Sequence, residues 1–196
     1  MLGHALANKG IDQFCHTVYS SDLSRARDTA RAALSAFGSK GEAFAIQLDT
    51  RLRERSLGLF QGLTAAQCDQ EHRAAWRTFN KGACRAELDS AGAIGVEDDE
   101  ELQARALAAL SDIVVKHAGE TVVVVSHGGW IHAALACCAA QEAVPHIGNG
   151  SISTLILSAD CRGWMKSGPE NSHIRVGAAK GNVDMIGICG TVRSGK

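Results

Sequence analysis

The sequence predicts an α/β fold, in the form of a three-layer α/β/α sandwich with a mostly parallel central sheet. Short apolar runs that suit strands alternate along the chain with longer segments whose apolar residues recur at helical spacing. One of these runs, Val122–Val125, lacks polar alternation, which is typical of a strand buried on both faces of a parallel sheet. The length of 196 residues is enough for one domain with a sizeable core.

The N-terminal part of the chain contains two strand candidates and a well-patterned helix. Residues Leu2–Lys9 look like the end of a helix closed by Gly10, but no N-cap residue precedes them. A run of apolar, β-branched and aromatic residues predicts a strand over Phe14–Ser20. The apolar stripe of Ser21–Gly38 predicts a helix that ends at its glycine, and Ala43–Leu48 is a second strand candidate.

The middle of the chain mixes loops with helices. Asp49–Leu63 is expected to form a loop or short turns, Ala65–Phe79 a weak helix, and Lys81–Ile94 irregular structure. Asp98 is a suitable N-cap for a helix over Glu100–His117, because acidic residues follow it in the first turn.

The C-terminal part begins with the valine run, which predicts a strand over Thr121–Ser126. A compact apolar helix is expected over Trp130–Ala140. Ser151–Ser158 and Arg162–Lys166, joined by a polar turn, predict a hairpin, and we expect the glycine-rich chain beyond Gly168 to be partly loosely ordered.

Charge and cysteine content exclude several classes of protein. With 20 basic and 21 acidic residues the net charge is -1, so no large positive field attracts nucleic acid. No apolar run reaches membrane-spanning length, and the N-terminus lacks the apolar region of a signal peptide. The seven cysteines are odd in number and lack zinc-like spacing, which favours free thiols over a disulfide framework. We therefore expect a cytoplasmic protein that binds neither nucleic acid nor membrane, although a targeting segment before Met1 is left open.

The stretch VVVVSHGGW places polar residues where open α/β sheets bind ligands. Ser126 and His127 follow the valine run, at the carboxyl end of the predicted strand. Gly128 and Gly129 then let backbone amides approach a ligand at the start of the next helix, where the helix dipole favours an anion. The alternative is a buried structural histidine in a strand-to-helix turn.

Two further residues suit an anion site. Arg25 lies one turn into the helix that follows the first strand, where a guanidinium can hold a phosphate with two hydrogen bonds. Glu54 lies in a loop between two arginines, and a carboxylic acid beside a phosphate dianion holds its proton well enough to donate it. Taken singly, each residue also fits a solvated surface position.

Together these segments resemble the histidine phosphatase superfamily, in its phosphoglycerate mutase-like branch. The matching stretches are YSSDLSRARDTA, LRERSLGLFQGL, GVEDDEEL, VVVVSHGGW and NGSIS, and the likeness covers Met1–Lys166, with residues 167–196 as a tail of uncertain order. The resemblance implies phosphomonoester hydrolysis through a phosphohistidine, without a metal or an organic cofactor. It also implies a small phosphorylated metabolite as substrate, and leaves a homodimer open.

The resemblance assigns roles to individual residues. It implies that Arg25 binds the phosphoryl group, that Glu54 is the general acid, and that His127 stabilises the phosphoryl group. Four further phosphate-binding candidates lie at strand ends or turns that face the same site: Ser21, Gly128, Asn149 and Gly150.

The nucleophile of the family is missing from these residues. It is a histidine in an Arg-His-Gly motif at the end of a first strand, and none of the eight histidines here has that context. In the family this strand lies between the strands that end in YSS and VVVVS, so we expect two unpaired inner edges and an inactive chain. A gene-model error, a splice form and a true loss all fit this pattern. A non-catalytic module that binds a phosphoanion or a protein is the alternative, as is a mutase-type phosphotransferase parent.

Overall fold

The computed structural model describes residues 3, 6–7, 13, 15–42, 44–138, 147–157 and 183–189. Contacts within the chain divide it into two compact units. The first unit consists of Met1–Glu54 with Ala106–Lys196, and the second of Arg55–Arg105. All the strands of the sheet belong to the first unit.

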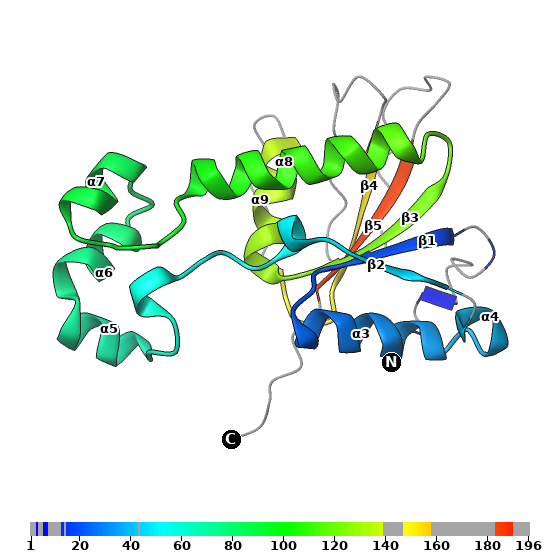
Figure 1. Ribbon diagram of the computed structural model, residues 1–196, viewed down its shortest axis with the longest axis horizontal. Helices are drawn as coiled ribbons and strands as arrows, with labels where there is room; N and C mark the ends of the chain where they lie inside the picture. The colour runs from blue at the N-terminus through cyan, green and yellow to red at the C-terminus, as the bar shows by residue number, and fades with distance from the viewer. Residues whose placement is uncertain are drawn as a thin grey trace. The chain divides into compact units, whose positions relative to one another are not determined.

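Within the described residues the sheet has five strands, in the order β2-β1-β3-β5-β4 (Figure 1). In that order they span Ile46–Leu48, Cys15–Ser20, Thr121–Ser126, Val183–Cys189 and Ile152–Leu157. Every neighbouring pair is parallel except β4 with β5, which is antiparallel. The mostly parallel sheet that the sequence predicts is therefore confirmed, with β4 as its antiparallel edge.

The two strands expected to lack inner partners pair directly with each other. Val18 of β1 lies opposite Val123 of β3, and the amide of Ser21 donates to the carbonyl of Val125 at 2.9 Å. The register shifts between Cys15 and Thr17, at the start of β1. The expectation of unpaired edges is wrong, because β1 and β3 satisfy each other's backbone groups.

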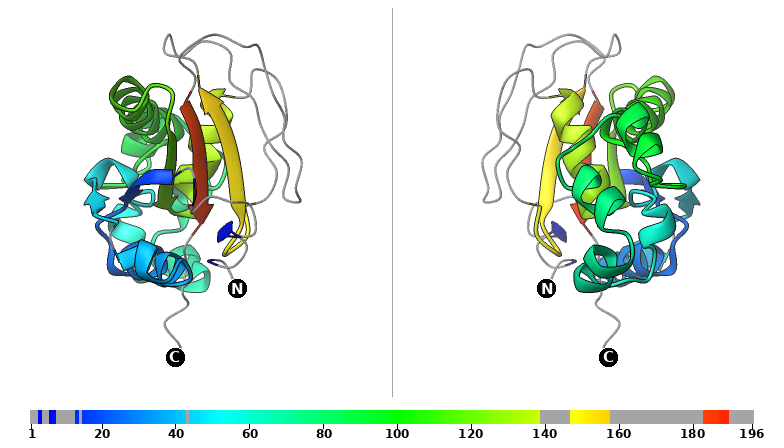
Figure 2. Two further views of the ribbon diagram at one scale, coloured as in Figure 1. Left: turned by 90° about the vertical axis from the view of Figure 1, so that its right-hand side faces the viewer. Right: turned by 90° about the vertical axis from the view of Figure 1, so that its left-hand side faces the viewer.

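Helices cover both faces of the sheet. Figure 2 shows them in two views from opposite directions. Helix α3 (Ser24–Ser35) packs its buried alanines and Leu34 on the face that carries Val18 and Val123. The neighbouring residue Tyr19 points to the opposite face, where it meets His117 beyond the end of α8 (Asp99–Lys116). The three-layer α/β/α fold class is confirmed.

The remaining elements of the first unit are short, apart from the helix after β3. Helix α4 (Ser39–Glu42) and the single 3₁₀ turn η1 (Thr50–Leu52) flank β2, which is shorter than the predicted Ala43–Leu48. Helix α9 (Gly128–Cys138) begins before the predicted Trp130, because the carbonyl of His127 already accepts the amide of Ile131.

The second unit is helical. It contains the 3₁₀ turn η2 (Gly58–Phe60), α5 (Ala65–Glu71), α6 (Arg73–Phe79) and α7 (Arg85–Ser90), followed by the first turns of α8. Its core consists of Phe60, Cys68, Ala75, Leu88, Ala93 and Val96. The prediction of irregular structure over Lys81–Ile94 is wrong, since α7 lies within it.

Some predicted segments lie outside the described residues. Of the predicted first helix, Gly3, Leu6 and Ala7 are described and are helical. The hairpin strand Arg162–Lys166 is not described, and the described partner of β4 is β5, a strand in the tail for which the sequence analysis predicted no element. In the part of the chain that the structure covers, no helix is long and apolar enough to cross a membrane.

Candidate functional site

The candidate site is built on the corner between β3 and α9. His127 is fully buried and acts as the N-cap of α9, since its carbonyl accepts the amide of Ile131 at 2.9 Å. The corner therefore lies at the carboxyl end of a central strand, where parallel sheets place their ligands. The prediction that Ser126 and His127 occupy this position is confirmed.

Three of the predicted side chains meet directly at this corner. Arg25 Nε donates to His127 Nδ1 at 3.2 Å, and His127 Nε2 lies 3.0 Å from Ser21 Oγ. Because a guanidinium only donates, His127 Nδ1 is the acceptor. The proton of the imidazole is then on Nε2, which donates to Ser21.

Local structure holds the partners of His127 in place. The amide of Ser21 is bonded to Val125 of β3, and Ser21 Oγ accepts the amide of Leu23 at 3.3 Å. Arg25 lies in the first turn of α3, where its carbonyl accepts the hydroxyl of Thr29 at 2.7 Å. The β1–α3 turn thus brings a hydroxyl and a guanidinium to the same imidazole.

Glu54 approaches the corner from the other side. The amide of Gly129 donates to Glu54 Oε2 at 3.3 Å, so the carboxylate lies at the N-terminus of α9. A side chain at position 129 would place its Cβ 2.5 Å from Glu54 Oε1. Glycine at this position is therefore what allows the carboxylate to approach, and the positive end of the helix dipole favours its charge.

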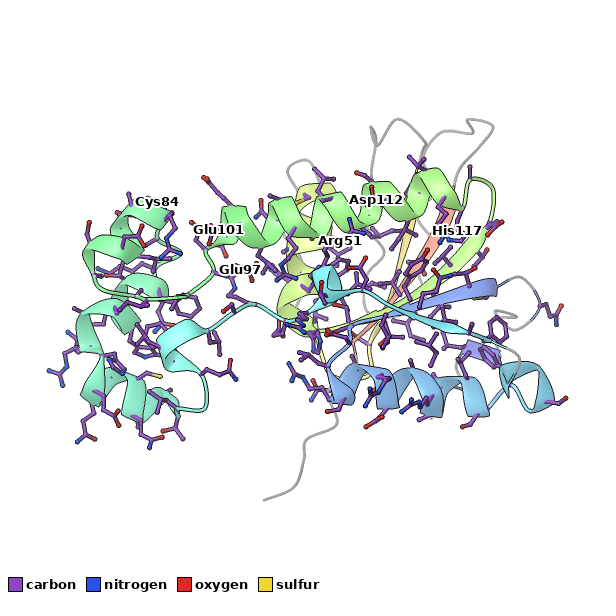
Figure 3. The ribbon with its side chains drawn as sticks, viewed as in Figure 1. Arg51, Cys84, Glu97, Glu101, Asp112 and His117 are labelled. Atoms are coloured by element: carbon purple, nitrogen blue, oxygen red, sulfur yellow. The ribbon has the colours of Figure 1, made fainter. Side chains whose placement is uncertain are left out.

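The segment that carries Glu54 is anchored by Arg51 (Figure 3). The guanidinium donates to both carboxylate oxygens of Asp49, to Oδ1 at 3.1 Å and to Oδ2 at 2.8 Å, and to Asp112 of α8 at 2.5 Å. These hydrogen bonds, that to Asp49 foremost, raise the pKa of Arg51. Burial alone would raise the pKa of Asp49, but the hydrogen bonds and charge of Arg51 outweigh it and lower that pKa.

A second ion pair joins the Glu54 segment to the β1–α3 turn. Arg53 donates to both carboxylate oxygens of Asp22, at 2.7 and 2.5 Å. The hydrogen bonds from Arg53 lower the pKa of Asp22. Asp22 adjoins Ser21, and Arg53 adjoins Glu54. This ion pair therefore links the segment that carries Ser21 to the segment that carries Glu54.

The structure therefore brings together most of the predicted site residues, all of them within the first unit. Ser21, Arg25 and His127 are in direct contact, and Glu54 reaches the same corner through the amide of Gly129. Gly128 is the first residue of α9. Asn149 and Gly150 lie in the turn before β4, with Gly150 at φ +72°, and their role as phosphate ligands stays a prediction.

Two hydrogen bonds of the corner did not follow from the sequence, which assigned Trp130 no role and Ser126 only its place at the strand end. The indole Nε1 of Trp130 donates to the carbonyl of Arg51 at 2.7 Å. Ser126 likewise donates to the carbonyl of Leu52 at 2.7 Å. A buried indole needs an acceptor, which is the signal that points to Trp130. Among the described residues, no group of three or more His, Cys, Asp or Glu side chains is placed to hold a metal ion.

Known proteins with similar sequences are phosphate-ester enzymes by name. Phosphoglycerate mutase-like protein 4 of Arabidopsis thaliana is 39% identical over 114 residues, which are 58% of this chain and 46% of that protein. The metal-independent phosphoserine phosphatase of the same plant is 36% identical over 117 residues, 59% of this chain and 45% of that protein. The chain thus spans less than half the length of these curated relatives.

Solved structures agree on the fold. The mycobacterial glucosyl-3-phosphoglycerate phosphatase is 28% identical with a TM-score of 0.63, over 85% of this chain and 82% of that one. The phosphoglycerate mutase of Bacillus anthracis, at 22% identity, has a TM-score of 0.65 over 85% and 75% of the two chains, and supports the fold alone. The model of the histidine phosphatase superfamily (branch 1) matches residues 1–166. This chain is therefore a member of the histidine phosphatase superfamily.

Proposed function

We propose that the β3–α9 corner is the phosphate site of a phosphomonoester hydrolase acting on a small phosphorylated metabolite. The observation that carries this proposal is the direct contact of Arg25, His127 and Ser21 at the end of a central parallel strand. Phosphatases among the relatives of known name support hydrolysis over phosphoryl transfer to a second substrate.

Each group has a defined task in this proposal. Arg25 neutralises the phosphoryl oxygens, and the Nε2–H of His127, which donates to Ser21 in the free protein, takes a phosphoryl oxygen as its acceptor instead. Glu54 protonates the leaving oxygen, which contributes roughly 10²- to 10⁴-fold in rate. Arg25 now donates to His127, so an arriving phosphate replaces the imidazole as the acceptor for its guanidinium.

We further propose that residues 1–196 do not hydrolyse phosphate esters at the rate of the family, and the geometry of His127 supports this. Covalent catalysis needs an unprotonated imidazole nitrogen aimed at phosphorus. In this proposal Nε2 of His127 carries the proton and donates to the phosphoryl oxygens, and a single ring cannot do this and aim its Nδ1 at phosphorus as well. His16 lies within β1, and His132 is exposed on α9. These observations equally favour a second candidate, a non-catalytic module that binds a phosphoanion.

Binding of inorganic phosphate to the full chain tests the site. Isothermal titration calorimetry should give a measurable Kd that weakens by about tenfold or more in Arg25→Gln and in His127→Gln, since each variant loses a charge-assisted or buried hydrogen bond. Arg31→Gln is the matched control, because Arg31 lies on the exposed surface of the same helix and pairs with Asp28. Equal affinity in all four proteins would contradict the assigned site.

Trapping of an acid-labile phosphohistidine tests the lack of a nucleophile. After incubation of residues 1–196 with a phosphodonor we expect no stoichiometric labelling and no turnover of an aryl phosphate. Stoichiometric label that disappears in His127→Ala would show that His127 is itself the nucleophile.

A further inference from the structure

We propose that Trp130 and Ser126 are positioning residues that hold the proton-donor candidate Glu54 on the same corner as His127. The name of proton donor rests on the proposed function, whereas the positioning itself rests on hydrogen bonds among described residues. Both side chains donate hydrogen bonds to the backbone of the segment before Glu54.

The two side chains bind consecutive carbonyl groups. Trp130 Nε1 donates to the carbonyl of Arg51 at 2.7 Å, and Ser126 Oγ donates to the carbonyl of Leu52 at 2.7 Å. Trp130 is only 2% exposed and Ser126 is fully buried. Water is therefore excluded from both donors. Each donor depends on its carbonyl partner, because buried polar groups in proteins are hydrogen-bonded.

The segment they hold has little regular structure to fix it. Arg51 and Leu52 belong to η1, a single 3₁₀ turn, and Arg53 after it is extended with φ −63° and ψ 157°. Hydrogen-bond geometry in such turns is poor, and they are stable only in short pieces. The direction in which the chain leaves toward Glu54 therefore depends on contacts from outside the turn.

Residues of the corner divide their contacts between the two parts of the site. His127 faces Ser21 and Arg25 on the β1–α3 side. Ser126, Gly129 and Trp130 face the Glu54 segment, through two carbonyls and one carboxylate. The stretch Ser126–Trp130 thus helps to set where the carboxylate lies relative to the imidazole, together with the ion pairs of Arg51 and Arg53.

The amide of Gly129 reports whether Glu54 is in place. In the free protein, its NMR chemical shift should change when Glu54→Gln removes the carboxylate, and the size of this change is then measured in the background of each further variant. We expect Trp130→Phe to reduce the amplitude of the change to less than half of that in the unmodified protein. Comparing amplitudes removes the constant shift caused by exchanging one aromatic ring for another.

Ser126→Ala provides an independent test without an aromatic change, and a smaller loss of amplitude is expected because one of the two carbonyl bonds remains. Trp76→Phe is the matched control, since Trp76 packs on Phe60 in the second unit. Its amplitude should equal that of the unmodified protein. If Trp130→Phe does not fold, the serine variant decides the matter.

Full amplitude in Ser126→Ala and in a folded Trp130→Phe would overturn the proposal. These measurements use no ligand, so their outcome does not depend on whether the corner binds phosphate. Arg25→Gln can lose phosphate binding while the change in the Gly129 amide shift stays the same. That result would support the proposed function, whereas the positioning role is decided by the Trp130 and Ser126 variants.

Discussion

Gly129 is the residue at which the backbone of α9 and the candidate proton donor meet. A Cβ at this position lies 2.5 Å from Glu54 Oε1, closer than atoms in contact approach. Gly129→Ala should therefore displace the carboxylate. The helix itself gains by about 0.5–1 kcal/mol, because alanine is a better helix former than glycine. We expect an unfolding free energy within about 1 kcal/mol of the unmodified protein, measured in urea. The NMR shift of the amide at position 129 should no longer respond to Glu54→Gln.

Glu54→Gln serves as the reference for that experiment, because it removes the carboxylate without adding a Cβ to the helix. If the amide shift still responds to Glu54→Gln in the Gly129→Ala background, Glu54 and the helix start are not in the contact described, which would count against the close approach.

The buried hydroxyl of Ser126 should matter for stability as well as for positioning. Ser126→Ala leaves the carbonyl of Leu52 without this donor in a site that water does not reach, and we expect a loss of about 1–3 kcal/mol in unfolding free energy. Ser90→Ala is a matched control, since Ser90 Oγ donates to the carbonyl of Ala86 on an exposed helix surface. That variant should change stability by less than about 0.5 kcal/mol. Equal losses of unfolding free energy in Ser126→Ala and Ser90→Ala, measured in urea, would contradict this prediction.

The site residues differ in how far the sequence could predict them. Arg25, Glu54 and His127 could be predicted because each lies in a stretch whose residue types and position suit anion chemistry. The role of Trp130 could not, since nothing in the sequence says which carbonyl an indole reaches. The direct bond between Arg25 and His127 was likewise out of reach, because it depends on how closely β1 and β3 approach.

At the scale of elements, the N-cap of α8 forms at the residue that the sequence predicts. Asp98 Oδ1 accepts the amide of Glu101 at 2.8 Å, and Glu101 Oε2 accepts the amide of Asp98 at 3.0 Å, which is a capping box. Asp98→Ala should lower the unfolding free energy by about 1 kcal/mol. Asp98→Asn, which keeps an acceptor, should restore most of the loss in the same denaturation experiment, and no recovery would argue against capping.

Helix α7 shows where local signals fail. Its N-cap is Cys84, a residue type without a strong capping preference, and the helix has only six residues. Glu87 bonds back to the amide of Cys84, and Leu88 packs into the core of the second unit. Packing rather than propensity therefore decides this helix, which is why the sequence predicted irregular structure there.

Glu97 gives the second unit a pH-dependent stability. Arg105 donates to its two carboxylate oxygens at 2.8 Å each, and the amide of Ser56 donates at 3.0 Å to a side chain that is 13% exposed. Burial raises the pKa of Glu97, but these hydrogen bonds and the charges of Arg105 and Arg55 outweigh it, so the pKa is lowered overall.

A carboxylate with a lowered pKa stabilises the fold above its ordinary titration range. That stability is lost as the pH falls through the pKa of the folded state. Glu97→Gln should cost about 1–3 kcal/mol near neutral pH and make unfolding less dependent on pH below the ordinary range of glutamate. Glu100→Gln, at an exposed position in the first turn of α8, is the control and should keep the dependence seen in urea titrations of the unmodified protein. An unchanged slope in Glu97→Gln would contradict this account.

At the scale of the whole molecule, the layers could be predicted but the neighbours within the sheet could not. Alternating strands and helices fix the α/β class, because each apolar face has to be covered. Which strands pair depends on which strands compete for an edge. In the part of the chain described, β1 and β3 pair with each other, and β5 from the distant tail takes the other side of β3.

This topology determines how an added nucleophile strand would have to enter. A strand bearing Arg-His-Gly, fused before Met1, can pair at an outer edge, beside β2 or β4, or be inserted next to β3. At either outer edge it would lie three strand spacings from β3, roughly 14 Å at about 4.8 Å a spacing, too far for its histidine to share a phosphate with His127. Insertion next to β3 places the two imidazoles on adjacent strands, and of the two sides of β3 only the β1 side also faces Arg25, since α3 follows β1. Insertion on that side would also separate Arg25 from His127 by about one spacing, which makes room for a phosphoryl group between them.

We therefore predict that the fused protein forms a phosphohistidine only if the pairing of β1 with β3 is broken. Hydrogen exchange of the amides that join the two strands, among them that of Ser21, should show new partners in the fused protein that is labelled by an aryl phosphate. A fusion in which the added histidine is replaced by alanine should insert equally well, because the strand is otherwise unchanged. It should remain unlabelled, because it lacks the imidazole that accepts the phosphoryl group. Labelling of the added histidine while the bond from Ser21 to Val125 persists would mean that the strand acts from an edge, and the central-strand requirement would be wrong.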